Sequence, residues 1–231
     1  MKKFAMFAIA ALTLASCSTG TKNIKNLSEK DSVAYCLGID FGKGIKQSVY
    51  QLDSTLNYDI IMQGLKEGWN GEEQINIEDA YAFLNDYFYV RVPARNLEES
   101  TAFLEKIAKE NPNVKVTDSG LMYEIIETGN EVKPSNAMDQ LLVSYKGTLK
   151  DGQVFDQNDS IELPLGRGMI QGWEEGLKFI GEGGKINLYI PSTLGYGAQA
   201  RGKIKANDAL VFEVELHQVI TPEMQGKGSQ R

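Results

Sequence analysis

The spacing of apolar residues changes near Pro112, and this change constrains the fold more than any other feature of the sequence. Before it, apolar side chains recur every three or four positions, which is the period of an amphipathic helix. After it, they alternate with polar side chains, which is the period of a strand with one buried face. The sequence therefore predicts an α+β protein, with an all-α domain at residues 28–112 and a sheet-forming domain at residues 113–221.

Three helices are expected in the first domain. The first covers residues 32–49, where one apolar face would hold Val33, Leu37, Phe41 and Ile45. A second, shorter helix fits residues 59–69. The third follows Asn76, a favourable N-cap, and continues to residue 110 with one interruption at Pro93.

The third helix is too long to bury its apolar face within a unit of this size. From 76 to 110 it would extend about 50 Å, at 1.5 Å per residue. Helices of a second subunit would cover the face, so the sequence predicts a homodimer. A monomer whose helix bends back at Pro93 is the alternative.

The second domain is predicted to be an antiparallel sheet with one helix. Strands are expected at residues 114–125, 141–145, 185–190 and 210–219, and Lys150-Asp151-Gly152 is a hairpin signal. Between the strands, residues 169–177 form a short helical stretch. It would pack on the sheet through Ile170, Trp173 and Leu177.

The composition excludes several classes of function. Lys and Arg total 24 against 31 Asp and Glu, a formal net charge of −7. That charge would repel a nucleic-acid backbone, so no nucleic-acid partner is expected. One His and two Cys cannot supply a closed zinc site or a disulfide framework, so no metal and no cofactor are expected. Cys36 is predicted to be a buried apolar residue.

The N-terminus carries the pattern of an exported protein. Met1-Lys2-Lys3 is a basic start, and the apolar run at 4–15 is shorter than the about 20 residues of a membrane span. Leu14-Ala15-Ser16-Cys17 resembles a bacterial lipobox, in which small residues precede a cysteine that receives lipid. The sequence predicts a signal peptide at 1–16 and a lipidated tether at 17–27. Ordinary secretion with an incidental cysteine is the alternative.

These features predict a lipid-anchored, periplasm-facing protein of the bacterial cell envelope. Ser18 after the cysteine is compatible with delivery to the outer membrane, which is favoured over the inner one. At the other end, residues 222–231 have no apolar period and are expected to form a mobile tail.

Five ordered segments of the second domain resemble the macrolide-binding FKBP-type peptidyl-prolyl cis/trans isomerases. They are VSYKGTLKDGQVFD (143–156), IQGWEEGL (170–177), GGK (183–185), IPSTLGYG (190–197) and LVFEVEL (210–216). The helical half is similar, more weakly, to the dimerisation arm of the exported macrophage-infectivity-potentiator group of that family. The resemblance implies an antiparallel half-barrel sheet wrapped on a short helix, with an apolar groove that takes a proline ring.

The resemblance also assigns roles to residues of the groove. It implies that Trp173 is the floor under the proline ring, and that the Ile170 N–H and the Tyr196 hydroxyl donate to substrate carbonyls. Asp156 would border the twisting amide. The catalytic set is then Asp156, Tyr196, Trp173, Phe155 and Ile170, and the substrate-binding set is Tyr145, Met169, Ile204 and Phe212. Without the resemblance, the apolar members would be equally well read as plain core.

The sequence also departs from the family pattern at the rim of the groove. Ile161 and Leu163 stand where aromatic residues are common, and residues 199–206 carry Arg and Lys where relatives have apolar or His residues. These departures put macrolide affinity and substrate preference in question more than the fold.

The implied function is peptidyl-prolyl isomerisation that assists the folding of exported proteins. Rotation about an amide costs 18–20 kcal/mol because resonance is lost on twisting. No group has to be protonated or attacked, so a chain with one His can still be an enzyme. Unfolded or proline-containing polypeptides are the expected partners. The alternatives are an envelope chaperone that uses the same cleft without significant isomerase activity, and a scaffold that only binds a proline-containing partner.

Overall fold

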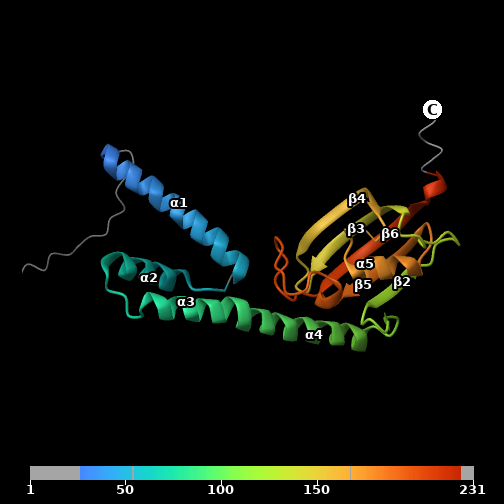
Figure 1. Ribbon diagram of the computed structural model, residues 1–231, viewed down its shortest axis with the longest axis horizontal. Helices are drawn as coiled ribbons and strands as arrows, with labels where there is room; N and C mark the ends of the chain where they lie inside the picture. Colours follow the sequence, from blue (N-terminus) through green and yellow to red (C-terminus); the bar gives the residue numbers. More distant parts are fainter. Residues whose placement is uncertain (1–26, 54, 167, 225–231) are drawn as a thin grey trace, which may run out of the picture. The chain divides into compact units, whose positions relative to one another are not determined.

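The computed structural model describes residues 27–53, 55–166 and 168–224 (Figure 1). The expected signal peptide, Cys17, the tether up to residue 26 and the end of the tail from residue 225 lie outside the described residues. Residues up to Ser48 form one compact unit and residues from Val49 form another, so each is described by itself.

The helices of the first half lie where the apolar period predicts them. They are α1 (Glu29–Leu52), α2 (Tyr58–Asn70), α3 (Ile77–Asp86), a π-helical turn η2 (Tyr87–Arg91) and α4 (Val92–Glu110). Asn57 caps α2 and Asn76 caps α3 through their side chains. The Asn76 cap was expected from the sequence.

Pro93 does not break the third helix. It occupies the first turn of α4, where a missing N–H costs least. The preceding turn widens to the π form, and the N–H of Val92 bonds to the carbonyl of Tyr87. The long helix predicted from 76 to 110 therefore continues through α3, η2 and α4.

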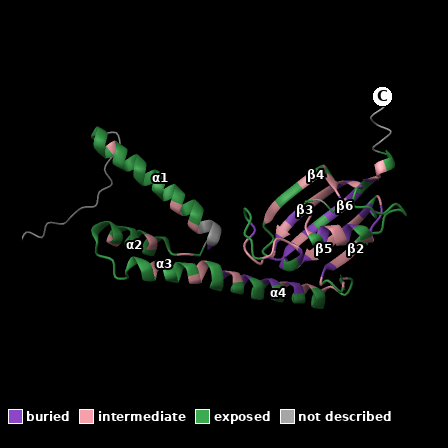
Figure 2. Cartoon of the chain, viewed as in Figure 1, coloured by how far each residue is buried: buried purple, intermediate pink, exposed green. Residues whose placement is uncertain are grey.

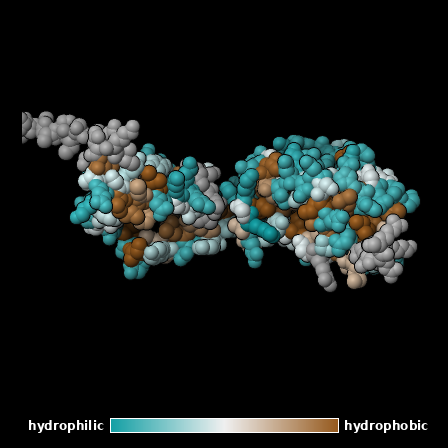
Figure 3. Space-filling model, turned by 90° about the horizontal axis from the view of Figure 1, so that it is seen from above, coloured by the Kyte–Doolittle hydropathy of each residue, from teal (hydrophilic) through white to brown (hydrophobic). Residues whose placement is uncertain are grey.

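The first three helices leave their apolar side chains exposed. Neither α2 nor α3 contains a buried residue, and Figure 2 shows α1, α2 and α3 largely in the colour of exposed residues. Figure 3 shows hydrophobic surface over these helices. Cys36 on α1 is exposed as well, so the prediction of a buried cysteine is wrong.

The second half contains a six-stranded antiparallel sheet in the order β1-β2-β5-β6-β3-β4. The strands are β1 (Lys115–Val116), β2 (Met122–Glu127), β3 (Gln140–Leu149), β4 (Val154–Pro164), β5 (Gly184–Ile190) and β6 (Leu210–Ile220). The single strand expected at 114–125 is two paired strands, because the chain turns at Gly120 with a φ of 90°. The strand β4 had no apolar alternation strong enough to predict it.

One face of the sheet packs against the short helix α5 (Gln171–Gly176), followed by the 3₁₀ turn η3 (Leu177–Phe179). Glycines allow this close approach. A Cβ on Gly172 would meet the side chain of Ile190 at 2.6 Å, and one on Gly176 would meet Leu188 at 2.4 Å. The core between helix and sheet includes fully buried Leu177, Leu188 and Leu216. The predicted α+β fold, with a sheet wrapped on a short helix, is confirmed.

Within the described ranges, no helix has both the length and the apolar character needed to cross a bilayer. The described start of the expected tail, residues 222–224, forms a helical turn.

Candidate functional site

An aromatic pocket of about 170 Å³ opens between α5 and the concave face of the sheet. Its volume is below the roughly 300 Å³ of the smallest drug-sized ligand sites, so it suits one small ring. The lining comes from β3, β4, the segment before α5, α5 itself, the loop after β5 and β6. It consists of Tyr145, Phe155, Asp156, Leu163, Gly168, Met169, Ile170, Trp173, Tyr196 and Phe212.

Trp173 lies at the centre of the pocket and is only 5% exposed. Tyr145 and Phe212 meet its ring edge to face, each with ring centroids 5.1 Å away. Phe155 packs in the same way on Phe212, at 5.4 Å. This perpendicular packing is a preferred geometry of aromatic pairs, and it holds the rings of the pocket walls against one another.

The indole nitrogen of Trp173 is an exception to the usual pairing of buried polar groups. Among the described residues, Nε1 of Trp173 is the only buried side-chain nitrogen or oxygen atom without a hydrogen-bond partner. An unpaired buried donor costs about 1–3 kcal/mol. The site therefore holds the indole in place by packing alone.

Asp156 is held at the pocket edge by Tyr145, whose hydroxyl donates to Oδ2 at 2.7 Å. Burial raises the pKa of Tyr145, and the hydrogen bond to Asp156 raises it further. The phenol therefore stays protonated at neutral pH and keeps the carboxylate oriented.

Two hydrogen-bond donors of the pocket have no acceptor among the described residues. The N–H of Ile170 precedes the first turn of α5, where Ile170 is the N-cap residue in an extended conformation. The hydroxyl of Tyr196 makes no hydrogen bond either, although its ring lines the pocket. Both donors are free to bind carbonyl oxygens of a substrate.

The structure brings together eight of the nine residues predicted to bind or act on substrate. The exception is Ile204, which lies in the buried core and is absent from the lining. A direct contact between Ile204 and substrate stays a prediction. The lining also includes Leu163 and Gly168, which were not in the predicted set. Leu163 had been noticed only as a departure from the aromatic family pattern.

The loop between Gly197 and Ala209, here called the flap, runs beside the pocket. Arg201 and Ile204 bond to each other through both backbone amides, at 2.8 and 3.0 Å. The guanidinium of Arg201 lies over the Tyr196 ring, 5.3 Å from its centroid. Lys203 donates to the carbonyl of Val154 at 2.9 Å, which joins the flap to β4.

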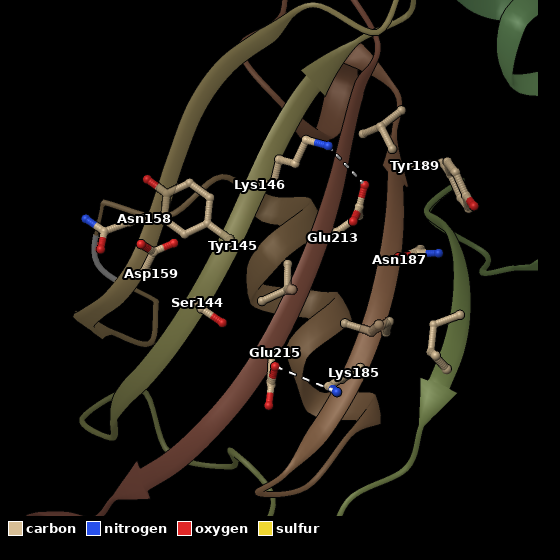
Figure 4. Close-up of a pocket in the computed structure, with 14 residues that line it drawn as sticks. Ser144, Tyr145, Lys146, Asn158, Asp159, Lys185, Asn187, Tyr189, Glu213 and Glu215 are labelled. Atoms are coloured by element: carbon tan, nitrogen blue, oxygen red, sulfur yellow. Dashed lines mark ion pairs between the residues drawn. The ribbon is translucent and has the colours of Figure 1, made fainter.

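A larger hollow, of about 650 Å³, lies on the opposite face of the sheet (Figure 4). Its two lysines are ion-paired, since Lys146 contacts Glu213 at 3.8 Å and Lys185 contacts Glu215 at 3.9 Å. His217 also lies on this polar face and hydrogen-bonds to Ser144 at 3.0 Å. The smaller pocket is the better candidate site, because its aromatic walls fit one small ring and two free donors lie beside them.

Each half of the chain matches a protein-family model. Residues 131–217 match the model of the FKBP-type peptidyl-prolyl cis-trans isomerases. Residues 30–125 match the model of the domain amino terminal to FKBP-type peptidyl-prolyl isomerase.

Individual relatives match along almost the whole chain. The FKBP-type peptidyl-prolyl cis-trans isomerase FkpA of Escherichia coli K12 is 34% identical over 227 residues, covering 91% of this chain and 82% of FkpA. The outer membrane protein MIP of Legionella longbeachae is 29% identical over 229 residues, covering 93% and 96%. The crystal structure of Escherichia coli FkpA has a TM-score of 0.57 and 32% identity, covering 83% of this chain and 97% of that one.

Proposed function

The chain belongs to the FKBP-type peptidyl-prolyl cis-trans isomerases and is an enzyme of that class, and on this premise we propose that it assists the folding of exported proteins in the bacterial cell envelope. Uncatalysed isomerisation of an X-Pro bond takes tens to hundreds of seconds, which is slow enough to limit folding. Unfolded chains with proline are the proposed substrates. The name of one relative, the outer membrane protein MIP, supports this location.

The proposed mechanism is differential binding of the twisted amide. Twisting removes resonance, so the amide oxygen and nitrogen carry less charge than in the planar form. A dry aromatic pocket disfavours the more polar planar state relative to the twisted state. Each tenfold gain in rate needs about 1.4 kcal/mol, so apolar walls and two directed hydrogen bonds can supply a useful acceleration.

Each residue of the aromatic pocket has a proposed role in this mechanism. Trp173 is proposed as the floor under the proline ring, with Tyr145, Phe155 and Phe212 as its walls and Met169 at its edge. The two free donors, the Ile170 N–H and the Tyr196 hydroxyl, would hold the carbonyls on either side of the proline. Asp156, fixed by Tyr145, would face the rotating amide. These two free donors beside an aromatic enclosure carry the proposal most directly.

A protease-coupled assay on a tetrapeptide with an X-Pro bond tests the site. Tyr196→Phe removes only a hydroxyl, and we expect kcat/KM to fall about tenfold. Phe155→Ala opens the wall and should lower it as well, whereas His217→Ala on the far face should not. The rate should be flat from about pH 6 to 8, since the mechanism uses no titrating base. A bell-shaped profile for the isomerisation step would refute the mechanism.

We also propose that the helical half pairs two chains. In one chain the apolar side chains of α1, α2 and α3 are uncovered, including Phe41, Ile60, Trp69 and Tyr81. Exposed apolar area of this extent normally marks an interaction surface. A second copy would bring the same surface, as isologous pairing requires.

A lipid anchor at Cys17 is the proposed link to the membrane, with the periplasmic face of the outer membrane as its place. Metabolic labelling with a fatty acid tests it. The wild type should incorporate label and Cys17→Ser should not, with the variant recovered either in the soluble fraction or as uncleaved precursor. Equal labelling of the two would exclude lipidation at Cys17.

A chaperone function is the second candidate, favoured by the same exposed apolar surface of α1 to α3. A Tyr196→Phe, Phe155→Ala chain, whose isomerase activity should be strongly reduced, distinguishes the two functions. If it still suppresses aggregation of a proline-free client, the helices bind unfolded chains independently of catalysis. Macrolide binding stays a separate proposal, for which the less aromatic rim at Leu163 predicts weak affinity.

A further inference from the structure

One face of α4 is buried, and half of its buried residues are polar. Val92, Asn96, Ser100 and Leu104 are the buried residues of this helix. Their spacing of four places them on one face. A buried amide and a buried hydroxyl need hydrogen-bond partners, because a polar group left unpaired in the protein interior loses its hydrogen bonds to water without replacement.

The partners lie at the end of the flap. Asn96 Nδ2 donates to the carbonyl of Ala206 at 3.1 Å, and the N–H of Ala209 donates to Ser100 Oγ at 2.9 Å. In the opposite direction, Asn207 Nδ2 donates to the carbonyl of Pro93 at 3.0 Å. Three hydrogen bonds thus join one helix face to residues 205–209, here called the flap base.

Ion pairs and apolar packing also join α4 to the flap base. Lys150 contacts Glu99 of α4 at 2.7 Å and buried Asp208 of the flap base at 3.7 Å. Asp208 also accepts from the N–H of Lys205 at 2.7 Å. Leu104 packs with Ala209 in a small apolar cluster.

Asn207 connects this junction to the aromatic pocket. Its backbone N–H donates to the carbonyl of Gly197 at 2.8 Å, directly after Tyr196. Its φ is 63°, and among the residues that the structure describes it is the only non-glycine residue with a positive φ. One residue therefore bonds to α4 through its side chain and to the neighbour of Tyr196 through its backbone.

We propose that Asn207 is a positioning residue for Tyr196, and that α4 holds it in place through Pro93, Asn96 and Ser100. The helix that leads from the paired region is then part of the active-site scaffold. Its contacts fix where the Tyr196 hydroxyl points, although no atom of α4 lines the pocket. The inference rests on the isomerase activity of the family and adds residues outside the pocket to it.

Asn207→Gly in the full chain is the sharpest test. Glycine adopts a positive φ without strain, so the substitution removes the side-chain amide and leaves the backbone conformation accessible. Loss of one hydrogen bond is worth about 0.5–1.5 kcal/mol, so kcat/KM on an X-Pro tetrapeptide should fall by about threefold to tenfold. Ser100→Ala should act in the same direction from the helix side.

The adjacent residue provides a matched control. The hydroxyl of Thr101 is exposed and bonds to the carbonyl of Leu97 within α4, at 2.8 Å. Thr101→Ala should leave kcat/KM unchanged, although it removes the same kind of group one residue away.

A double-mutant cycle with Tyr196→Phe separates positioning from general destabilisation. If Asn207 acts through the Tyr196 hydroxyl, Asn207→Gly should cost less than about twofold in the Tyr196→Phe background. The same fold loss in both backgrounds, or no loss in the wild-type background, would overturn the proposal.

Hydrogen exchange gives a readout that does not depend on activity. The amides of the flap should exchange faster in Asn207→Gly and Ser100→Ala than in the wild type and Thr101→Ala. Equal exchange would also overturn the proposal. A wild-type chain with no rate enhancement but a protected flap would instead contradict the enzymatic function and leave the positioning contacts supported.

Discussion

The two halves of the molecule treat their apolar side chains in opposite ways. In the sheet domain, Leu188 has no exposed surface and packs against Gly176 of α5. In α2, Leu65 is 49% exposed and Trp69 is 87% exposed. Both halves have a regular pattern of apolar residues, but this pattern forms a complete core in the sheet domain and an uncovered surface in the helices. On the proposed pairing of two chains, we expect the sheet domain to be stable alone and the helices to depend on a partner.

Identical truncations in the two halves should have different consequences. Leu188→Ala leaves a cavity in a packed core and should cost about 2–5 kcal/mol of unfolding free energy, independent of protein concentration. Leu65→Ala should cost a dimer part of its interface, so its effect on thermal unfolding should depend on protein concentration. Denaturation at two concentrations tests this.

The matched control is Lys66→Ala, next to Leu65 on α2, which should change neither stability nor sedimentation. A concentration-independent loss for Leu65→Ala would show that the α2 surface is not an interface between copies.

Removing the helices in two steps separates pairing from positioning. A fragment of residues 92–221 keeps α4 and should be monomeric and active on tetrapeptides. A fragment of residues 118–221 loses α4 and should be about threefold to tenfold less active, because the flap base loses its hydrogen bonds.

Both fragments should lose most of their acceleration of a proline-limited refolding reaction. In a dimer, a long client released by one pocket can be recaptured by the other at a raised effective concentration. If the 92–221 fragment accelerated refolding of the client as much as the full chain does, the helices before α4 would have no role in this reaction beyond that of a spacer.

A last prediction concerns Asp53, a buried carboxylate in the loop between α1 and α2 that is only 2% exposed. Burial alone would raise its pKa, but hydrogen bonds from Thr55, Tyr87 and Arg95 outweigh burial and hold the pKa well below the ordinary value. A lowered carboxylate pKa adds stability that is complete above the unfolded pKa of about 3.9 and is lost as pH falls through the folded value.

We therefore expect Asp53→Asn to lower helical stability by about 1–3 kcal/mol at pH 7 and at pH 5 alike. The difference from the wild type should shrink below about pH 4, where the wild-type carboxylate begins to lose this advantage. Far-UV circular dichroism during urea unfolding at three pH values measures it. A difference that grows in acid would contradict the assigned shift.

Local sequence patterns predicted the secondary structure better than the long-range contacts between side chains. The helix bounds and the alternation in β6 follow from side-chain period, and eight pocket residues followed from family motifs. The junction of α4 and the flap base left no trace in the sequence, because Asn96, Ser100 and Asn207 are ordinary polar residues until the fold buries them. Cys36 was misjudged for a related reason, since a residue type alone does not say whether its helix is covered.

The hydrogen bond between Pro93 and Asn207 spans 114 positions of the chain. Closing so long a loop is entropically costly, and contacts of this kind slow folding compared with local helix formation. During refolding, helical structure should therefore form well before the flap is anchored. Isomerase activity would be among the last properties that the folding enzyme acquires.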